Sequence, residues 1–318
     1  MRRPAPPRPA PGRTVPLLSV LAATALLLTA CGTEHGGAGG TGAGAAGAAA
    51  RTQIDDPGKD GVRVTSLTLP SPSPSPTRSY SVSADSLPGD SGIVAAYEVT
   101  NKGSETLTYT IVITFTSADG GAMGNQTVTV RAVGPGRTVR GTVRAGVLPP
   151  GTPRVTGAKV LEVTKVPSGE APAAPGTCPA SGIRVSADRG DAAMGLRVVG
   201  LHLDNCGTRD YSVDGYPVLE LLDDDLQHVD GIKILDGGGG ITFGDADDEP
   251  AGPVTLKPGE SALATLTWRN TTDFGTAVNV PHVRVRAKAG APPVIVTPNL
   301  DLGTTGKLGV TAWRPAKD

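Results

Sequence analysis

The chain is poor in aromatic residues, and its apolar N-terminal run is too short to span a bilayer. Phe, Trp and Tyr make up 3% of the 318 residues. Surfaces that bind sugars or single-stranded nucleic acid usually present stacking aromatics, and these few rings must also serve the hydrophobic cores. A spanning helix needs about 20 apolar residues, more than the run from Leu17 to Leu28 provides. A stacking platform and a membrane-spanning helix are therefore both disfavoured.

The chain also lacks an excess of basic residues outside its N-terminus. Residues 1–30 contain Arg2, Arg3, Arg8 and Arg13 and no acidic residue. Without these four arginines, 25 basic residues remain against 30 acidic ones, a net charge of −5. Nucleic acid and anionic lipid headgroups need a basic surface. We therefore expect neither of them as a partner.

The N-terminal segment has the order of a secretory signal, with arginines first, then an apolar run, then small residues and a cysteine. Its end, Leu28-Thr29-Ala30-Cys31, resembles the lipobox of bacterial lipoproteins. The resemblance implies that residues 1–30 are removed as a signal peptide and that Cys31 carries the lipid. It also implies attachment to the extracytoplasmic face of the cell membrane. The alternatives are an ordinary secretory signal and an uncleaved anchor.

The chain has three cysteines, and a lipidated Cys31 leaves an even pair, Cys178 and Cys206. In an oxidising compartment such a pair is expected to form a disulfide. The alternative is two free buried thiols. A bridge that closes a loop of this size stabilises the fold by about 3–4 kcal/mol in the chain-entropy model.

Alternating apolar and polar residues predict short strands and no helix. The clearest strand has Leu107, Tyr109, Ile111, Ile113 and Phe115 on one face and threonines on the other. Short strands separated by Gly and Pro turns are typical of β-sandwiches. We therefore predict an all-β fold with two immunoglobulin-like β-sandwich domains in tandem, after a signal peptide and a flexible tether. The predicted boundaries are residues 1–30 (signal), 31–57 (tether), 58–166 (first domain), 167–177 (linker) and 178–318 (second domain).

The first predicted domain resembles the FxLYD-type immunoglobulin-like modules of bacterial envelope proteins over residues 92–166. The resemblance rests on the turn from Val99 to Ser104, the threonine-backed strand and the Pro135-Gly136 turn. It implies an immunoglobulin-like module.

The two predicted domains share a plan. Asn101-Lys102-Gly103-Ser104 has a counterpart in Asn205-Cys206-Gly207-Thr208, and Pro135-Gly136 has one in Pro258-Gly259. Asn and Gly tolerate positive φ, and Pro-Gly suits a type II turn. The Asn–Pro separation is 34 positions (135 − 101) in the first domain and 53 (258 − 205) in the second. We therefore expect an insertion in the second domain, from Asp223 to Pro253.

The second predicted domain resembles the actinobacterial secreted domain of unknown function 4232 over residues 178–313. The resemblance rests on five features in order: Cys178, Asn205-Cys206, Gly215-Tyr216-Pro217, the turn Leu256–Ser261 and the strand that ends in Trp268. It implies a secreted or lipid-anchored β-rich module to which no activity is attached. In many members the second cysteine falls a few residues later, where this chain has Tyr211-Ser212.

Catalytic and metal-binding patterns are weak. Gly89-Asp90-Ser91-Gly92 matches the flank of a protease nucleophile, but the one histidine before it, His35, falls in the tether. His202, His228 and His282 lack the spacing of a zinc pair. The acidic run Asp245, Asp247, Asp248 and Glu249 offers carboxylates that could bind Ca²⁺, but Pro250 stands where an EF-hand requires glycine. We expect no enzyme activity and no cofactor.

The sequence therefore predicts a non-catalytic binding or scaffolding module at the bacterial cell envelope. Its expected partners are the membrane, through the N-terminal lipid, and an envelope protein or cell-wall component. The alternative is a ligand- or Ca²⁺-dependent binding protein that uses the acidic insertion loop of the second domain.

Overall fold

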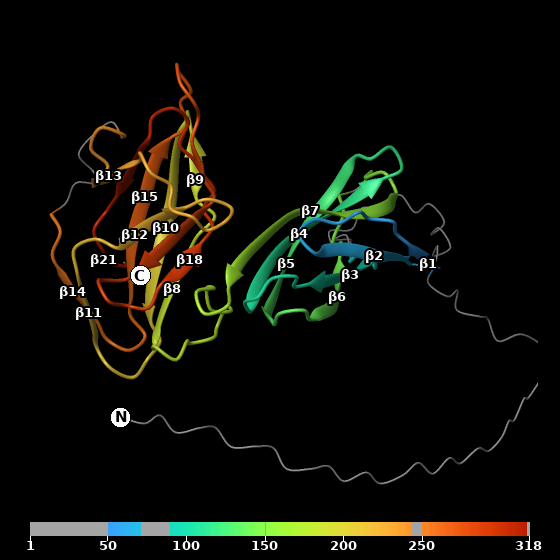
Figure 1. Ribbon diagram of the computed structural model, residues 1–318, viewed down its shortest axis with the longest axis horizontal. Helices are drawn as coiled ribbons and strands as arrows, with labels where there is room; N and C mark the ends of the chain where they lie inside the picture. Colours follow the sequence, from blue (N-terminus) through green and yellow to red (C-terminus); the bar gives the residue numbers. More distant parts are fainter. Residues whose placement is uncertain (1–49, 71–89, 150, 243–249, 317–318) are drawn as a thin grey trace, which may run out of the picture. The chain divides into compact units, whose positions relative to one another are not determined.

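The computed structural model describes residues 50–70, 90–149, 151–242 and 250–316. In these ranges the secondary structure consists of strands without any helix, which confirms the predicted all-β class (Figure 1). No helix in the described part of the chain is long and apolar enough to span a membrane. The described strands surround two large hydrophobic cores, and we call the two groups of strands the N-terminal and the C-terminal sandwich. A third, small cluster consists of Val166, Leu222 and Ile295.

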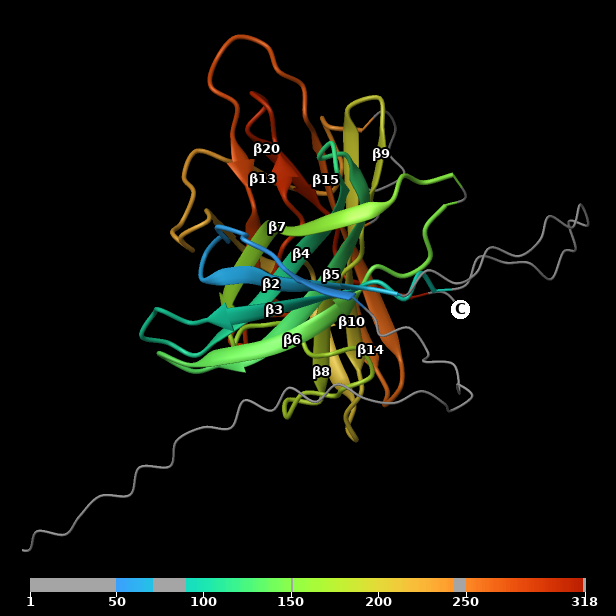
Figure 2. The same cartoon turned by 90° about the vertical axis from the view of Figure 1, so that its right-hand side faces the viewer.

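The N-terminal sandwich consists of two antiparallel sheets that enclose one core, with orders β1-β2-β3-β6 and β5-β4-β7 (Figure 2). The strands are β1 (Ala50–Gln53), β2 (Val62–Leu69), β3 (Val94–Thr100), β4 (Leu107–Ser117), β5 (Ala122–Val133), β6 (Thr138–Arg144) and β7 (Val155–Pro167). The predicted apolar face of β4 is confirmed, because Tyr109, Ile111, Ile113 and Phe115 are buried and Leu107 is half-buried. Alternate side chains of one strand point to opposite faces, so β4 places these side chains against the facing sheet.

The predicted tether, residues 31–57, is wrong at its C-terminal end. Strand β1 lies within it and pairs with β2. The carboxylate of Asp56 also accepts hydrogen bonds from the amides of Val64 (2.9 Å) and Val160 (3.2 Å). All four residues of β1 are exposed, so the strand is held by backbone pairing at a sheet edge. An exposed edge strand has no apolar alternation, and pattern reading therefore missed it.

The C-terminal sandwich surrounds its core with one large sheet and three smaller ones. The large sheet has the order β13-β20-β15-β10-β8, with β9 and β21 pairing at its side, and a second sheet has the order β12-β17-β18. Two strand pairs, β11-β14 and β16-β19, complete it. The strands are β8 (Ile183–Ala187), β9 (Asp191–Ala193), β10 (Leu196–Asn205), β11 (Tyr211–Asp214), β12 (Val218–Leu222), β13 (Lys233–Asp236), β14 (Pro253–Leu256), β15 (Ser261–Arg269), β16 (Asn279–Val280), β17 (His282–Arg286), β18 (Val294–Val296), β19 (Leu300–Asp301), β20 (Lys307–Val310) and β21 (Arg314–Pro315).

The insertion expected from Asp223 to Pro253 contains a strand that the sequence did not predict. Strand β13 pairs in parallel with β20 at the end of the large sheet, and the two lie side by side in Figure 2. Its Ile234 is exposed although apolar. A four-residue strand without alternation gives no periodic signal, because its position depends on the backbone of β20.

The shared plan of the two sandwiches is a buried asparagine at the end of a strand. In the N-terminal sandwich, Asn101 Nδ2 donates to the carbonyl oxygens of Glu105 and Val133, each at 2.7 Å. Its Oδ1 accepts from Gly103 N at 2.9 Å, and its backbone oxygen accepts from Gly136 N at 2.8 Å. One residue thus joins its own turn to the Pro-Gly turn.

The C-terminal sandwich repeats the same four bonds around Asn205. Its Nδ2 donates to the carbonyl oxygens of Arg209 and Leu256, each at 2.8 Å. Its Oδ1 accepts from Gly207 N, and its backbone oxygen accepts from Gly259 N at 2.7 Å. Both asparagines are essentially fully buried.

The physical reason for the shared motif differs from the expected one. Gly136 and Gly259 do adopt positive φ, 66° and 89°, as type II turns require. Neither Asn101 nor Asn205 has positive φ. The asparagines are therefore required for their side-chain amides, which satisfy backbone groups of two separate turns.

We predict that Asn101→Ala destabilises the N-terminal sandwich by about 2–4 kcal/mol, because it leaves two carbonyls and one amide without their partner. The neighbouring Lys102→Ala, at an exposed position, should change stability by less than about 0.5 kcal/mol. Urea unfolding of the two variants measures the difference. Equal unfolding midpoints would contradict the role given to the buried amide.

Candidate ligand-binding site

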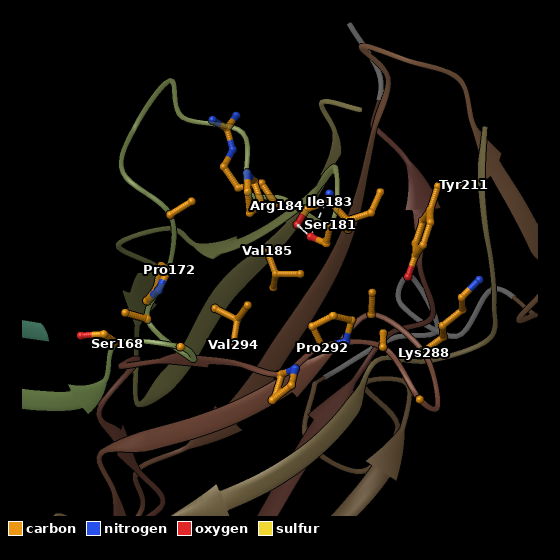
Figure 3. A pocket seen from close by; sticks show the side chains of 18 of the residues that line it. Ser168, Pro172, Ser181, Ile183, Arg184, Val185, Tyr211, Lys288, Pro292 and Val294 are labelled. Atoms are coloured by element: carbon orange, nitrogen blue, oxygen red, sulfur yellow. Dashed lines mark hydrogen bonds between the residues drawn. The ribbon is translucent and has the colours of Figure 1, made fainter. Parts of the chain in front are cut away.

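A cavity of about 510 Å³ opens between strands β8 and β18, and we call it the lateral cavity (Figure 3). It is lined by the segment that follows β7, by β8, by the turn between β17 and β18, by Tyr211 and by Arg131 of β5. Figure 3 shows Ser168 and Pro172 on one side and Tyr211 and Lys288 on the opposite side. Its volume falls within the range of small-ligand clefts in proteins, roughly 300–1,000 Å³.

The turn between β17 and β18 forms a rigid wall of the lateral cavity. The buried Trp313 donates from Nε1 to the carbonyl oxygen of Ala287 at 2.9 Å, and its own amide donates to Gly215 O at 2.9 Å. Arg286 closes the turn by donating to Ala291 O at 2.8 Å. Gly215 belongs to the Gly-Tyr-Pro turn, so that motif positions Trp313, and Trp313 positions the cavity wall.

The predicted linker, residues 167–177, forms the facing wall and is fixed to the C-terminal sandwich. Ile295 N donates to the carbonyl oxygen of Glu170 at 2.7 Å. The Glu170 carboxylate pairs with Arg284 Nε at 2.6 Å, and Arg284 also pairs with Glu220 at 2.7 Å. Arg284 is mostly buried, so the pair is better shielded from water than a surface ion pair.

Tyr211 and Lys288 form one end of the lateral cavity. Lys288 Nζ lies 4.4 Å from the centroid of the Tyr211 ring and donates to Ser212 O at 2.7 Å. A cation over an aromatic face is attracted by the ring quadrupole. Burial raises the pKa of Tyr211 above its ordinary value, so its hydroxyl stays neutral and can donate a hydrogen bond at neutral pH.

The lining of the cavity is cationic, although the chain as a whole carries a small negative charge. Arg131, Arg184 and Lys288 line it, and no Asp or Glu of the described ranges does. Arg184 is neutralised by Asp204 at 2.9 Å. Neither Arg131 nor Lys288 takes part in any of the ion pairs found in the described ranges. The site therefore suits a ligand that brings its own negative charge.

The predicted disulfide joins Cys178 to Cys206. It links the end of the predicted linker to the residue directly after Asn205. The bridge thus joins the segment that leads into β8 to the asparagine-centred turn. Pro179, the residue after Cys178, and Ser181 are among the residues that line the lateral cavity. The cysteine position that departs from many members of the expected family is compatible with a bridge here.

None of the other predicted site residues that the structure describes lines the lateral cavity. Cys31 and the Ca²⁺ candidates Asp245, Asp247, Asp248 and Glu249 lie outside the described residues. Within the described residues, no group of three or more His, Cys, Asp and Glu side chains could hold a metal ion. Ser91 lies beside a turn, where Asp90 accepts a hydrogen bond from Gly92 N. His202 and His228 each contact a nearby aspartate, Asp188 and Asp230.

His282 differs from these two histidines because it is buried. Its Nδ1 has no hydrogen-bond partner among the described residues. Burial lowers the pKa of His282 below its ordinary value of 6.5, and the carboxylates of Asp224 and Asp223 oppose this shift. Burial therefore favours the neutral form of the His282 imidazole.

Sequence reasoning missed the lateral cavity. Its walls come from segments more than 100 positions apart, joined by the Glu170–Arg284 pair. Pro292-Pro293 signals a turn between two strands, and nothing in that signal indicates a cavity. Tyr211 stands where many members of the expected family have a cysteine, which does not indicate a binding role. Lys288 belongs to no recognisable sequence motif.

The fold and the site define the C-terminal region as a disulfide-linked β-sandwich module with a lateral cavity. Residues 178–314 match the family described as "Domain of unknown function (DUF4232)", which confirms the resemblance expected for this region. No curated protein and no solved structure matches the chain. The expected resemblance of the first domain to FxLYD-type modules stays a prediction.

We predict that His282 makes stability fall as pH falls below about 6.5. The pKa of His282 is lower in the folded chain than in the unfolded chain. Between these two pKa values the unfolded chain binds a proton that the folded chain does not, so the free energy of unfolding falls as the pH falls. Above the unfolded pKa the contribution of His282 to stability is fully present. The loss should be at most about 1.4 kcal/mol per pH unit and should end at the lowered folded pKa. His282→Gln should flatten the dependence of the urea midpoint between pH 7 and pH 5. An unchanged slope in this variant would contradict the assignment.

Proposed function

We propose that this protein is a membrane-anchored extracytoplasmic lipoprotein that acts as a non-catalytic binding or scaffolding module at the bacterial cell envelope. Its partner is an envelope protein or cell-wall component that enters the lateral cavity. The single observation that carries the proposal is the cavity itself, with two fixed walls, an apolar lining and cations that lack acidic partners. Preformed concave sites with a few placed polar groups are typical of binding sites.

A non-catalytic role is supported by the chemistry of the lining. In the part of the chain that the structure describes, no His, Cys, Asp or Glu lines the cavity. Its two serines are engaged elsewhere: Ser168 Oγ lies 3.0 Å from Thr108 Oγ1, and Ser181 Oγ bonds the backbone of Ile183. Nucleophilic catalysis requires a base within hydrogen-bond reach of the nucleophile. Neither hydroxyl has such a neighbour in the part of the chain described.

The envelope location rests on the N-terminal sequence. Leu28-Thr29-Ala30-Cys31 resembles a lipobox, and acyl chains on Cys31 would hold the protein on a bilayer. Each buried methylene contributes about 0.8 kcal/mol, so two or three acyl chains suffice for stable attachment. The net charge of −5 expected for residues 31–318 argues against a nucleic-acid partner.

We predict that Cys31→Ala moves the protein from the membrane fraction to the soluble extracytoplasmic fraction, because it removes the acylated thiol. Thr33→Ala, two residues away, should leave the protein in the membrane fraction. Fractionation of cells that express each variant, followed by immunoblotting, measures the distribution. Continued membrane retention of the Cys31 variant would refute the lipid anchor.

We predict that Ala289→Trp abolishes partner binding by filling the lateral cavity. Ala289 is exposed and lines the cavity, so the substitution leaves the core intact. Ala251→Trp is the matched control, since Ala251 is also exposed and does not line the cavity. Cross-linking on intact cells should recover a partner with the parental chain and the control and lose it with Ala289→Trp. Equal recovery from both tryptophan variants would refute the cavity as the binding site.

A further inference from the structure

Strand β8 is the last strand of the large sheet, and it borders the lateral cavity. It pairs with β10 on one side, and no described strand pairs with its other side. Residues 183–185 of this strand line the cavity. The open edge of β8 and the lateral cavity are therefore one continuous surface.

The hydrogen bonds identify which backbone groups of β8 point outward. Asp188 N donates to Gly200 O at 3.0 Å, so Asp188 faces β10 at one end of the ladder. At the other end of the ladder, the backbone N–H of Asn205 in β10 donates to Glu260 O, and its backbone O accepts from Gly259 N. The backbone groups of Asn205 therefore point away from β8. In an antiparallel ladder, residues alternate between facing the partner strand and facing away. Ile183, Val185 and Ala187 therefore direct their N–H and C=O groups outward.

The first of these three outward positions is already occupied. The Ser181 hydroxyl donates to Ile183 O at 3.1 Å and accepts from Ile183 N at 3.3 Å. Val185 and Ala187 have no such partner in the described residues. Four backbone groups, two donors and two acceptors, thus remain to pair with an extended chain.

On the opposite side of the cavity, a turn of the predicted linker contacts the outer edge of β18. Strand β18 is the last strand of its own sheet, and its Ile295 amide bonds Glu170 of the predicted linker at 2.7 Å. This one bond does not involve β8, and no described residue forms a hydrogen bond with the outward backbone groups of Val185 and Ala187. An incoming chain would lie between the linker and β8, over the buried side chain of Val185.

The positive charge of Lys288 favours an acidic peptide as the incoming chain. Lys288 is exposed, lines the cavity and is not part of any ion pair in the described residues. Among the described residues, no carboxylate lines the cavity. A peptide carboxylate would therefore meet an unopposed cation, whereas a basic peptide would meet only like charge.

We propose that β8 accepts an extended acidic segment of a partner protein as an added strand, with its backbone on Val185 and Ala187 and a carboxylate on Lys288. This mode rests on the proposed function, because it places the partner in the lateral cavity. Strand addition draws affinity from main-chain hydrogen bonds and specificity from alternate side chains.

The test uses a randomised heptapeptide library panned against the full mature chain in detergent, followed by calorimetry with an enriched peptide. The enriched peptides should contain Asp or Glu, and replacing those acids with Lys should abolish binding. N-methylation of alternate backbone amides of the peptide should weaken binding by about three- to tenfold or more, because each methyl removes one main-chain hydrogen bond. Tight binding of neutral or basic peptides would overturn the proposal, and so would affinity that is unchanged by N-methylation.

Variants of the protein test the same contacts from the other side. Ala187→Pro removes an outward N–H donor that the β8–β10 ladder does not use. It should therefore lower the affinity for the peptide about three- to tenfold and leave the urea midpoint unchanged. Ala187→Val retains the amide and serves as the control. Lys288→Glu should lower the affinity for the acidic peptide at least as much. Lys288→Arg retains the positive charge and should retain the affinity. Undiminished affinity in Ala187→Pro and Lys288→Glu would overturn the proposal.

Two further outcomes separate this inference from the proposed function. If cells yield a cross-linked partner that is lost with Ala289→Trp but unaffected by Ala187→Pro, the cavity binds a ligand in another way and strand addition is wrong. If sedimentation shows a dimer that Ala187→Pro dissociates, the β8 edge binds a second copy of this chain, and the acidic partner is likewise wrong.

Discussion

The buried side-chain amide of one asparagine in each sandwich is the constraint on which the rest of the structure depends. Asn101 and Asn205 each join a strand end, their own turn and a Pro-Gly turn, through bonds that are the same in kind and number. A buried carbonyl or amide without a partner is costly, so removing the asparagine affects several backbone groups at once. In the C-terminal sandwich the next residue, Cys206, extends the constraint through the disulfide to the segment that leads into β8.

This arrangement leaves one side of the C-terminal sandwich open. The predicted linker is held by Glu170 at the β18 edge, and the turn between β17 and β18 is held by Trp313. Both walls are fixed by buried or shielded contacts, so the lateral cavity exists without a ligand to form it. Edge strands are usually short or charged, which limits unwanted pairing. Strand β8 has five residues and one charged side chain, Arg184, which Asp204 neutralises.

The sequence predicted those features that arise from local patterns. The alternation in β4, the Pro-Gly turns and the pairing of Cys178 with Cys206 were all predicted, because each depends on residues close together in the chain or on a count. The exposed strand β1 and the short strand β13 were not, since backbone pairing with distant strands forms them. The candidate site was not predicted either. Lys288 and Glu170 acquire their roles from neighbours that only the folded chain supplies.

Amide hydrogen exchange by NMR tests the central claim most directly, because it reports on each backbone group of β8 in the intact protein. We expect slow exchange for Ser186 N–H, which faces β10, and fast exchange for Val185 N–H and Ala187 N–H, which point away from β10. Protection of Val185 and Ala187 equal to that of Ser186 in the ligand-free chain would mean that the β8 edge is already paired, and would contradict the account.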